Sequence, residues 1–341
     1  IILSLKFQSP TKMIKLLQLW LTLSYVLVGF GDEKGTPKAR FSKKIMGTEV
    51  QIVVDAPMTD ALKKATDSAF REGIRLNMLF SDYEANSELS LFSQSSVDGR
   101  SVKLSDELFR VLEYGQELSR MSDGAFDVTL GPLTRLWRIA RFRQKLPKMS
   151  KLRETRQRTG YQKLVLNRLN TSGNLLVPGM VLDLGGIAKG YVADRMLEAM
   201  KNRGFAKCLI DAGGDLTIGD APKASKGWRV EIGGRPHPEL PVLELSNCAV
   251  ATSGDLEQNL EINGTRYSHL LNPKTGIGLK GSAQVTVVAP TGMIADSIAS
   301  TCLVLGMHKA PMFLAQTSAL KMYYLTESNS SIKVHQYLQP L

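Results

Sequence analysis

The order of helical and extended patterns between residues 180 and 306 constrains the fold more than any other feature of this chain. Residues 180–203 are typical of a strand, a glycine-containing turn and a helix. Short strands follow, and the region ends with a strand and a helix that Gly306 closes. The strands are expected at 207–211, 215–218, 228–232, 242–246, 249–252 and 282–290, and the last helix at 291–306. Because no linker or repeat interrupts the chain, we predict one intertwined α+β domain with mixed sheets and flanking helices.

The segments on either side extend this pattern. Residues 59–80 carry apolar side chains at helical spacing, and Ser105 is a suitable N-cap for a helix over 105–121. The Ser- and Asp-rich segment 81–99 between them is too polar to be buried throughout. Further strands are expected at 47–55, 320–327 and 330–337. The domain is therefore expected to span residues 45–338.

Composition limits the class of protein. Hydrophobic residues make up 43% of the 341 residues and charged residues 22%, which excludes a disordered chain, a collagen-like fibre and a coiled coil. Only one long apolar run occurs, so the chain is not a polytopic membrane protein. Cys208, Cys248 and Cys302 are too few and too scattered for a disulfide framework or a CxxC metal site. We expect a folded, mostly soluble protein whose thiols are buried.

The N-terminal segment 1–31 is interpreted as an export signal. Lys15 precedes the apolar stretch 16–28, and two glycines stand where a signal peptidase requires small residues. We expect the natural start at Met13, cleavage after residue 31 and a linker over 32–44. An uncleaved anchor with a single span is the alternative. Both interpretations place the folded part outside the cytoplasm, in the periplasm or associated with the inner membrane.

The positive charge of the chain is concentrated in one segment. The net charge is +11, and residues 135–158 contain ten Lys and Arg against a single acid, Glu154. That segment carries +9 and leaves +2 for the rest. With Trp137 and Phe142 it could bind nucleic acid or an anionic membrane surface, but no nucleic-acid-binding motif accompanies it. We favour a solvated helical insertion, expect no nucleic-acid partner and keep membrane contact open.

The run DLGGIAKG, from Asp183 to Gly190, combines a glycine turn with a helix start. Backbone N–H groups in such a turn can approach an anion, and the helix N-terminus favours negative charge. Lys189 would add a formal positive charge. The run is neither a Walker A loop nor a GxGxxG fingerprint. Phosphate binding and simple tight packing both remain open.

Two further motifs carry groups that could do chemistry. Asp296 and Ser300 lie at i and i+4 in ADSIAS, so on a helix they share one face. Carboxylate and hydroxyl oxygens suit Mg²⁺, although Asp296 could simply be a first-turn acid. His269 precedes a turn of Asn, Pro and Gly residues, which predicts an imidazole on a loop beside strand 282–290. It could act as a general base or be structural.

Two weaker signals complete the set. The run DAGGDLTIGD at 211–220 has glycines flanked by acids and could be only a tight hairpin. Tyr83 in the polar segment offers an aromatic face on which a planar ring could stack.

Taken in order, the motifs resemble the FAD:protein FMN transferase family, also called the ApbE family. The matching runs are MGTEVQI at 46–52, SDYEANSELSLFS at 81–93, GAFDVTLGP at 124–132, DLGGIAKGYVAD at 183–194, DAGGD at 211–215, ATSGD at 251–255, HLLNPKTG at 269–276 and VTVVAPTGMIADSIAS at 285–300. The resemblance implies a Mg²⁺-dependent enzyme that splits FAD, attaches FMN to a threonine of a target protein and releases AMP. Typical acceptors are flavoprotein subunits of membrane redox complexes.

The resemblance also implies roles for individual residues. The expected FAD contacts are Met46, Tyr83, Ala125, Phe126, Asp127, Asp183, Lys189 and Leu271. The expected Mg²⁺ ligands are the backbone carbonyl of Gly186 with Asp296 and Ser300. Catalysis is assigned to Asp296, through the metal, and to His269, which would position or deprotonate the incoming hydroxyl.

The chain departs from the family pattern at three positions. Phe30 stands where many members have a lipoprotein cysteine, so no lipid anchor is expected. Leu256 replaces a common Tyr after ATSGD, and Ser300 replaces a usual Thr but keeps the oxygen. Two other functions remain open: an FAD pyrophosphatase, with water as acceptor, and a non-catalytic extracytoplasmic FAD-binding protein.

Overall fold

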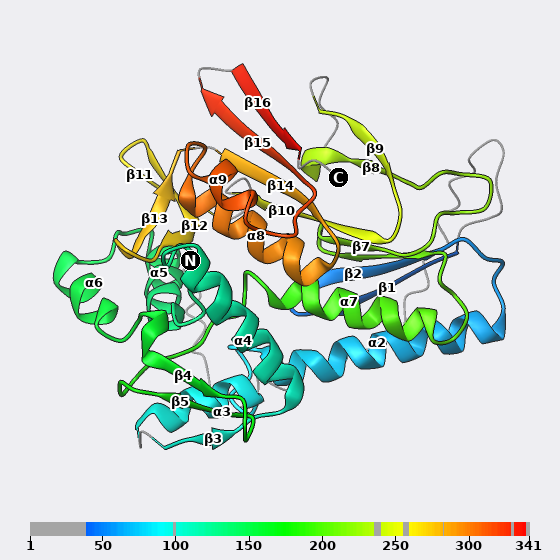
Figure 1. Cartoon of the computed structure of the whole chain (residues 1–341). Helices are drawn as coiled ribbons and strands as arrows, with labels where there is room; N and C mark the ends of the chain where they lie inside the picture. The colour runs from blue at the N-terminus through cyan, green and yellow to red at the C-terminus, as the bar shows by residue number, and fades with distance from the viewer. Residues whose placement is uncertain are drawn as a thin grey trace, which may run out of the picture.

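An eight-stranded sheet forms the centre of the molecule (Figure 1), and its strand order is β1-β2-β6-β7-β10-β14-β15-β16. The computed structural model describes residues 39–97, 100–234, 240–254, 259–281, 283–328 and 331–338. The strands of this sheet are β1 (Ala39–Ile45), β2 (Thr48–Val54), β6 (Cys208–Ala212), β7 (Leu216–Ile218), β10 (Cys248–Gly254), β14 (Ala283–Ala289), β15 (Lys321–Ser328) and β16 (Ser331–Leu338). The α+β class is confirmed. Every strand pair among the described residues is antiparallel, where mixed sheets were expected.

Three helices cover one face of the sheet: α2 (Asp60–Phe80), α7 (Ala188–Lys201) and α8 (Gly292–Leu305) (Figure 1). Alternate side chains of a strand point to opposite faces, so Ile52 packs into the main core under these helices. Its neighbour Val53 joins a second core with Trp228 on the other face. The hairpin of β8 (Trp228–Glu231) and β9 (Val242–Leu245) contributes to that second core.

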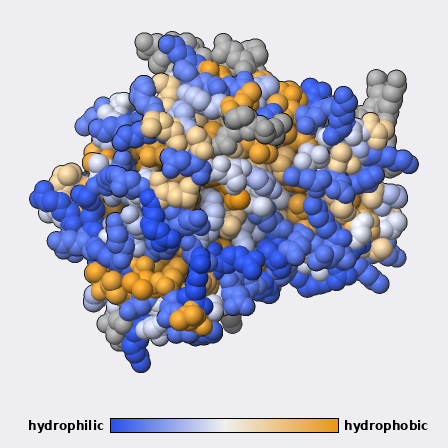
Figure 2. Space-filling view, viewed as in Figure 1, coloured by the Kyte–Doolittle hydropathy of each residue, from blue (hydrophilic) through white to orange (hydrophobic). Residues whose placement is uncertain are grey.

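Smaller elements extend the domain at one end of the sheet. Two three-stranded sheets lie there, β11 (Asn259–Ile262), β12 (Thr265–Asn272) and β13 (Ile277–Lys280), and β3 (Val102–Lys103), β4 (Leu164–Asn167) and β5 (Ser172–Leu175). The other helices are α3 (Glu88–Gln94), α4 (Asp106–Met121), α5 (Gly131–Arg143), α6 (Met149–Arg156) and α9 (Ala310–Leu314). Figure 2 shows that the face seen in Figure 1 is mostly hydrophilic, with scattered apolar groups.

Local hydrogen bonds mark the starts of the long helices, and the expected N-cap Ser105 is confirmed. Ser105 caps α4 by accepting a hydrogen bond from the N–H of Leu108 at 3.2 Å. Thr59 caps α2 by the same kind of bond, and Thr291 caps α8 with a longer one from the N–H of Ile294 at 3.4 Å. Such caps satisfy N–H groups that have no partner within the helix.

Other expectations need correction. The predicted linker 32–44 already forms β1 from Ala39, which pairs with β2, while residues 1–38 lie outside the described part. Residues 180–184, where a strand was expected, form neither a helix nor a strand. The N–H of Asp183 bonds the carbonyl of Val128 at 2.8 Å, so this segment pairs with a loop. By contrast, the polar segment 81–99 is not buried throughout, as expected: it contains α3, in which Leu89 and Phe92 are buried and Leu91 is 53% exposed.

All three cysteines are buried free thiols, as the sequence predicted. Burial raises the pKa of Cys208 to about 12 and that of Cys248 to about 11. Within the described residues, no helix combines the length and apolar character needed to cross a bilayer.

Helices α7 and α8 approach closely because both carry glycine at the contact. A Cβ on Gly190 would lie 2.0 Å from the carbonyl oxygen of Gly292. We therefore expect Gly190→Ala to lower the free energy of unfolding by about 3 kcal/mol, measured by urea denaturation. Gly204→Ala, where a Cβ meets open space at a φ of +84°, is the control and should cost only about 1 kcal/mol. Equal losses would show that α7 and α8 can separate freely.

Candidate active site

A cavity of about 190 Å³ opens where six segments of the chain meet. These are the α2–α3 loop, the α4–α5 loop, α5, the turn before α7, β12 and α8. Its lining comprises Tyr83, Ala125, Phe126, Asp127, Leu130, Thr134, Arg138, Arg141, Asp183, Gly185, Gly186, His269, Leu270, Leu271, Ser300 and Val304. The lining combines aromatic, cationic and oxygen-bearing side chains, as polar small-molecule sites do.

Arg138 organises one wall of the cavity. Its Nη1 donates to Oδ2 of Asp82 at 2.6 Å, and its Nη2 lies 3.6 Å from Oδ2 of Asp183. The guanidinium carbon is 4.3 Å from the centre of the Tyr83 ring, which is a cation–π contact. Burial raises the pKa of Asp82, and Arg138 opposes that rise. Tyr83 remains 75% exposed, so its ring can still receive a planar partner.

Arg141 adds a second cation one turn further along α5. Burial and the charge of Arg138 both lower its pKa, although an arginine remains charged. None of the ion pairs found among the described residues involves Arg141. Two neighbouring guanidinium groups, of which one lacks a carboxylate partner, favour an anionic ligand such as a phosphate.

The α4–α5 loop supplies a fixed, apolar part of the lining. Ala125 and Phe126 are buried. Oδ1 of Asp127 accepts bonds from the N–H of Thr129 at 2.8 Å and from its hydroxyl at 2.6 Å. Burial raises the pKa of Asp127, and these bonds oppose the rise. Asp127 therefore holds the loop in shape as well as facing the cavity.

An oxygen-rich corner lies where the turn before α7 meets α8. A Cβ on Gly186 would lie 3.2 Å from Oγ of Ser300, so a larger residue in this turn would crowd the serine hydroxyl. Ser300 Oγ and Ser253 Oγ share a hydrogen bond of 2.9 Å. Asp296, one helical turn before Ser300, is 4% exposed. Its Oδ2 accepts a bond from the N–H of Gly190 at 3.2 Å.

This corner fits the oxygen ligand set expected for Mg²⁺. The described residues contain no cluster of three His, Cys, Asp or Glu side chains able to hold a metal. The expected set needs only the Asp296 carboxylate, the Ser300 hydroxyl and a backbone carbonyl, with the remaining positions open to phosphate and water. Asp296 is not a first-turn acid of α8, because the first turn carries none.

Lys189 is held behind this corner by an ion pair with Asp215. Burial lowers the pKa of Lys189, but Asp215 and Asp296 outweigh that effect and raise it. For Asp296, burial and the charge of Asp215 raise the pKa, and Lys189 opposes them. Oδ1 of Asp215 also accepts a bond from the N–H of Thr252 at 3.1 Å. The lysine therefore stabilises two buried carboxylates instead of standing free for an anion.

Asp194 fixes the start of the helix that carries Asp296 and Ser300. Its oxygens accept bonds from the N–H groups of Gly292 at 2.6 Å and Met293 at 2.9 Å. Burial raises the pKa of Asp194 to about 6, and these bonds oppose the rise. A carboxylate from α7 thus caps α8 and ties the two helices together.

Comparison with known proteins places the chain in a family. A family model described as the ApbE family matches residues 46–324. The chain belongs to the ApbE family. It is 29% identical to the FAD:protein FMN transferase of Haemophilus influenzae over 321 residues, which cover 88% of this chain and 92% of that protein.

Solved ApbE structures share its fold. The flavin transferase ApbE from Vibrio cholerae superposes with a TM-score of 0.77 at 24% identity, over 88% of this chain and 96% of that one. The ApbE protein from Thermotoga maritima gives a TM-score of 0.77 at 25% identity, over 87% and 96% of the two chains.

In this ApbE-family chain most of the predicted site residues converge. The cavity lining contains Tyr83, Ala125, Phe126, Asp127, Asp183, Gly186, His269, Leu271 and Ser300. Asp296 and Lys189 are not in the lining but lie next to it. Asp296 accepts a bond from the N–H of Gly190, Lys189 pairs with Asp215, and the charges of both Lys189 and Asp215 act on Asp296. Met46 is not part of the lining; it packs against the main core with a φ of 54°. His269 lies in β12 rather than on the expected loop.

The basic segment 135–158 is more than the solvated insertion that the sequence favoured. Trp137 is buried, and its Nε1 donates to the carbonyl of Gly276 at 2.8 Å, so it is not available to stack on a base. Arg138 and Arg141 from the same segment line the cavity. Sequence reasoning missed both arginines because a dense run of cations hides which of them face inward.

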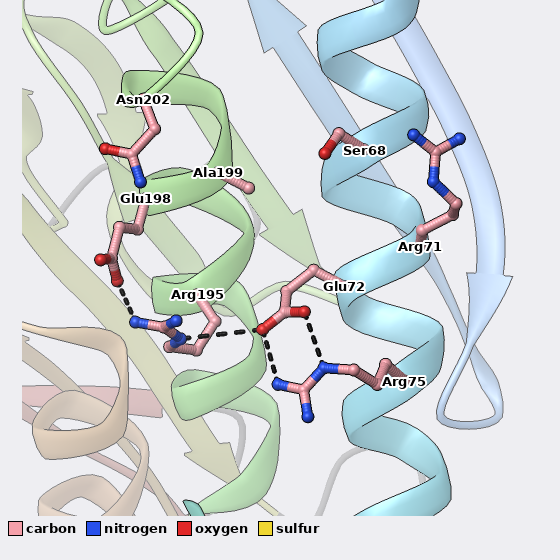
Figure 3. Close-up of a pocket in the computed structure, with 8 residues that line it drawn as sticks. All are labelled: Ser68, Arg71, Glu72, Arg75, Arg195, Glu198, Ala199 and Asn202. Atoms are coloured by element: carbon pink, nitrogen blue, oxygen red, sulfur yellow. Dashed lines mark hydrogen bonds and ion pairs between the residues drawn. The ribbon is translucent and has the colours of Figure 1, made fainter.

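A second cavity, of about 320 Å³, lies between α2 and α7 (Figure 3). Arg75 donates to both carboxylate oxygens of Glu72 at 2.8 Å. Arg195 pairs with Glu198 and lies 3.8 Å from Glu72. Figure 3 shows these side chains forming a row of ion pairs between the two helices. Carboxylates thus already engage two of its cations, which suits a link between α2 and α7 better than a ligand site.

Proposed function

We propose that this chain is a Mg²⁺-dependent FAD:protein FMN transferase. In the proposed reaction, the hydroxyl oxygen of an acceptor threonine attacks the FMN phosphorus of FAD. A phosphoester bond forms, the P–O bond of the pyrophosphate breaks, and AMP leaves with the bridging oxygen. The hydroxyl proton passes to a base, and no electrons are transferred.

One observation carries this proposal: Tyr83, the arginine pair and the Ser300 corner line one cavity. A flavin ring could stack on the exposed face of Tyr83. Arg138 and Arg141 would then meet the phosphates. A cavity of about 190 Å³ is smaller than a typical ligand pocket of about 300–1,000 Å³, so part of FAD would extend beyond it. The name of the Haemophilus influenzae relative supports the same reaction.

Different side chains have different roles in the proposed reaction. When bound, Mg²⁺ would be held by the Gly186 carbonyl, Asp296 and Ser300, and would neutralise charge on the pyrophosphate. His269 lines the same cavity and could accept the proton of the threonine hydroxyl on a ring nitrogen. Phe126 and Leu271 are buried in the wall and would exclude water, which would otherwise compete with threonine.

The acceptor and the compartment belong to the same proposal. The acceptor would be a flavoprotein subunit of a membrane redox complex. The folded part would act outside the cytoplasm, since the apolar stretch 16–28 has the pattern of an export segment.

The proposal is tested by incubating the full chain with FAD, MgCl₂ and a flavin-acceptor protein. We expect AMP release together with fluorescent flavin that stays on the acceptor after denaturing electrophoresis. Chelation of the metal should stop both, and an acceptor with its threonine changed to valine should remain unlabelled. AMP and free FMN without labelling of any acceptor would indicate an FAD pyrophosphatase instead. FAD binding without AMP release would indicate a non-catalytic carrier and overturn the proposal.

A further inference from the structure

We propose that the tip of the α5–α6 hairpin, residues 139–149, docks on an anionic lipid surface. This tip joins the end of α5 to the start of α6. Its sequence, IARFRQKLPKM, interleaves apolar and basic residues. The inference concerns where the protein binds and does not depend on the flavin chemistry.

The hairpin is firmly anchored on its inner side. Leu133, Trp137 and Leu152 form a small core with Leu260 and Leu271 of the β11–β13 sheet. The Trp137 bond to Gly276 fixes α5 against the same sheet. An anchored hairpin can present its outer side without rearrangement, which lowers the entropic cost of binding.

The outer side of the tip exposes large apolar side chains. Phe142 is 90% exposed, and Ile139, Leu146 and Met149 are exposed as well. An exposed phenylalanine is unfavourable in water, and several apolar groups gathered on one short segment mark an interaction surface.

Cations alternate with these apolar side chains along the segment. Arg143, Lys145 and Lys148 are exposed, and none of them takes part in an ion pair found among the described residues. The region around α6 in Figure 1 is correspondingly hydrophilic in Figure 2. Apolar groups that enter the acyl boundary, ringed by cations at the level of the headgroups, are typical of peripheral membrane binding.

An anionic bilayer fits these features better than an acidic protein does. The cations of the tip could bind an acidic protein or an anionic bilayer. A protein partner would also need pockets that fit the intermixed apolar side chains, whereas a fluid bilayer accommodates them without such pockets. Helix α5 also carries Arg138 and Arg141, which line the cavity. Docking of the tip would therefore hold the cavity close to the lipid surface.

The test measures binding of the full chain to vesicles by co-sedimentation. Vesicles of phosphatidylcholine with about 30% phosphatidylglycerol are compared with phosphatidylcholine alone, at about 0.05 M and about 0.5 M NaCl. The triple variant Arg143→Glu, Lys145→Glu, Lys148→Glu should bind the anionic vesicles at least about tenfold more weakly than the parent chain. Phe142→Ser should weaken binding severalfold without changing the salt dependence.

Matched controls separate the tip from overall charge and hydrophobicity. The variant Lys64→Glu, Arg71→Glu, Arg203→Glu makes the same charge change at exposed positions outside the hairpin. Leu169→Ser removes an apolar side chain that is 99% exposed in the β4–β5 turn. Both should bind like the parent chain. The N-terminal segment is identical in all variants, so its contribution cancels.

Two results would overturn the proposal. One is binding to anionic vesicles that the tip variants and the control variants reduce equally. The other is unchanged vesicle binding by the tip variants. If those variants also slow the labelling of an acceptor in lipid-free solution, the tip would be assigned to an acidic protein partner instead.

Discussion

Asp296→Asn is expected to abolish flavin transfer while leaving the fold intact. Asparagine keeps the volume of the side chain and an oxygen that can accept the bond from the N–H of Gly190. The substitution removes a buried negative charge that is repelled by Asp215. The only favourable charge interaction named for Asp296 that is lost is its attraction to Lys189. The anionic oxygen that Mg²⁺ would bind is lost, and we expect the transfer rate to fall at least about 100-fold.

The measurement combines activity with metal binding. Transfer is followed by covalent flavin fluorescence on the acceptor, and thermal unfolding is recorded with and without MgCl₂. Mg²⁺ should raise the melting temperature of the parent chain and not that of the variant, because a ligand stabilises only the state that binds it. Glu198→Gln is the control: it also replaces one carboxylate by an amide, on α7 in the row of ion pairs of Figure 3, and should behave like the parent. A variant that transfers flavin at the parental rate would remove Asp296 from the metal site.

The sequence predicted the relative placement of Asp296 and Ser300 correctly because that geometry is local. Asp296 and Ser300 are one helical turn apart, so helical periodicity alone puts them on one face. The caps at Thr59, Ser105 and Thr291 are also local signals, and they place three helix starts correctly. Interactions within about four residues are readable from the chain itself.

Contacts between distant segments escaped prediction. Arg138 meets Asp82 and Asp183 from segments that are far apart in the chain, and within a run of ten cations no local signal marks it. The ion pair of Lys189 was likewise not predicted, because its partner Asp215 comes from the β6–β7 hairpin. His269 was predicted on a loop because the turn that follows it dominates the local pattern, whereas β12 continues to Asn272.

Replacement of Arg138 by methionine is expected to cost both stability and FAD binding. The carboxylates of Asp82 and Asp183 are nearly buried, with side chains 10% and 13% exposed, and Arg138 is the cation that faces both. Removing one member of such a buried pair leaves uncompensated charge. We expect the free energy of unfolding at neutral pH to fall by about 2–3 kcal/mol. FAD should bind about tenfold more weakly, since the Arg138 guanidinium would no longer hold the Tyr83 ring in place or contact a phosphate of FAD.

The loss of stability should depend on pH in a defined direction. Burial already raises the pKa of Asp82 in the folded state, and Arg138 opposes the rise. Without Arg138 that pKa rises further, so the folded variant holds a proton that the unfolded chain releases at the same pH. A raised carboxyl pKa makes the folded state relatively more stable as pH falls through that value. The deficit of the variant relative to the parent should therefore be larger near pH 7 than near pH 5 in urea denaturation.

A second substitution distinguishes the electrostatic role from a purely steric one. Asp82→Asn in the Arg138→Met background should recover part of the stability at neutral pH, because one uncompensated carboxylate is gone. It should not restore FAD affinity, which depends on the guanidinium itself. Arg143→Met, on the same helix but exposed at the hairpin tip, should leave both quantities unchanged. A deficit that stays constant with pH and is not relieved by Asp82→Asn would mean that Arg138 acts through packing of Tyr83 rather than through charge.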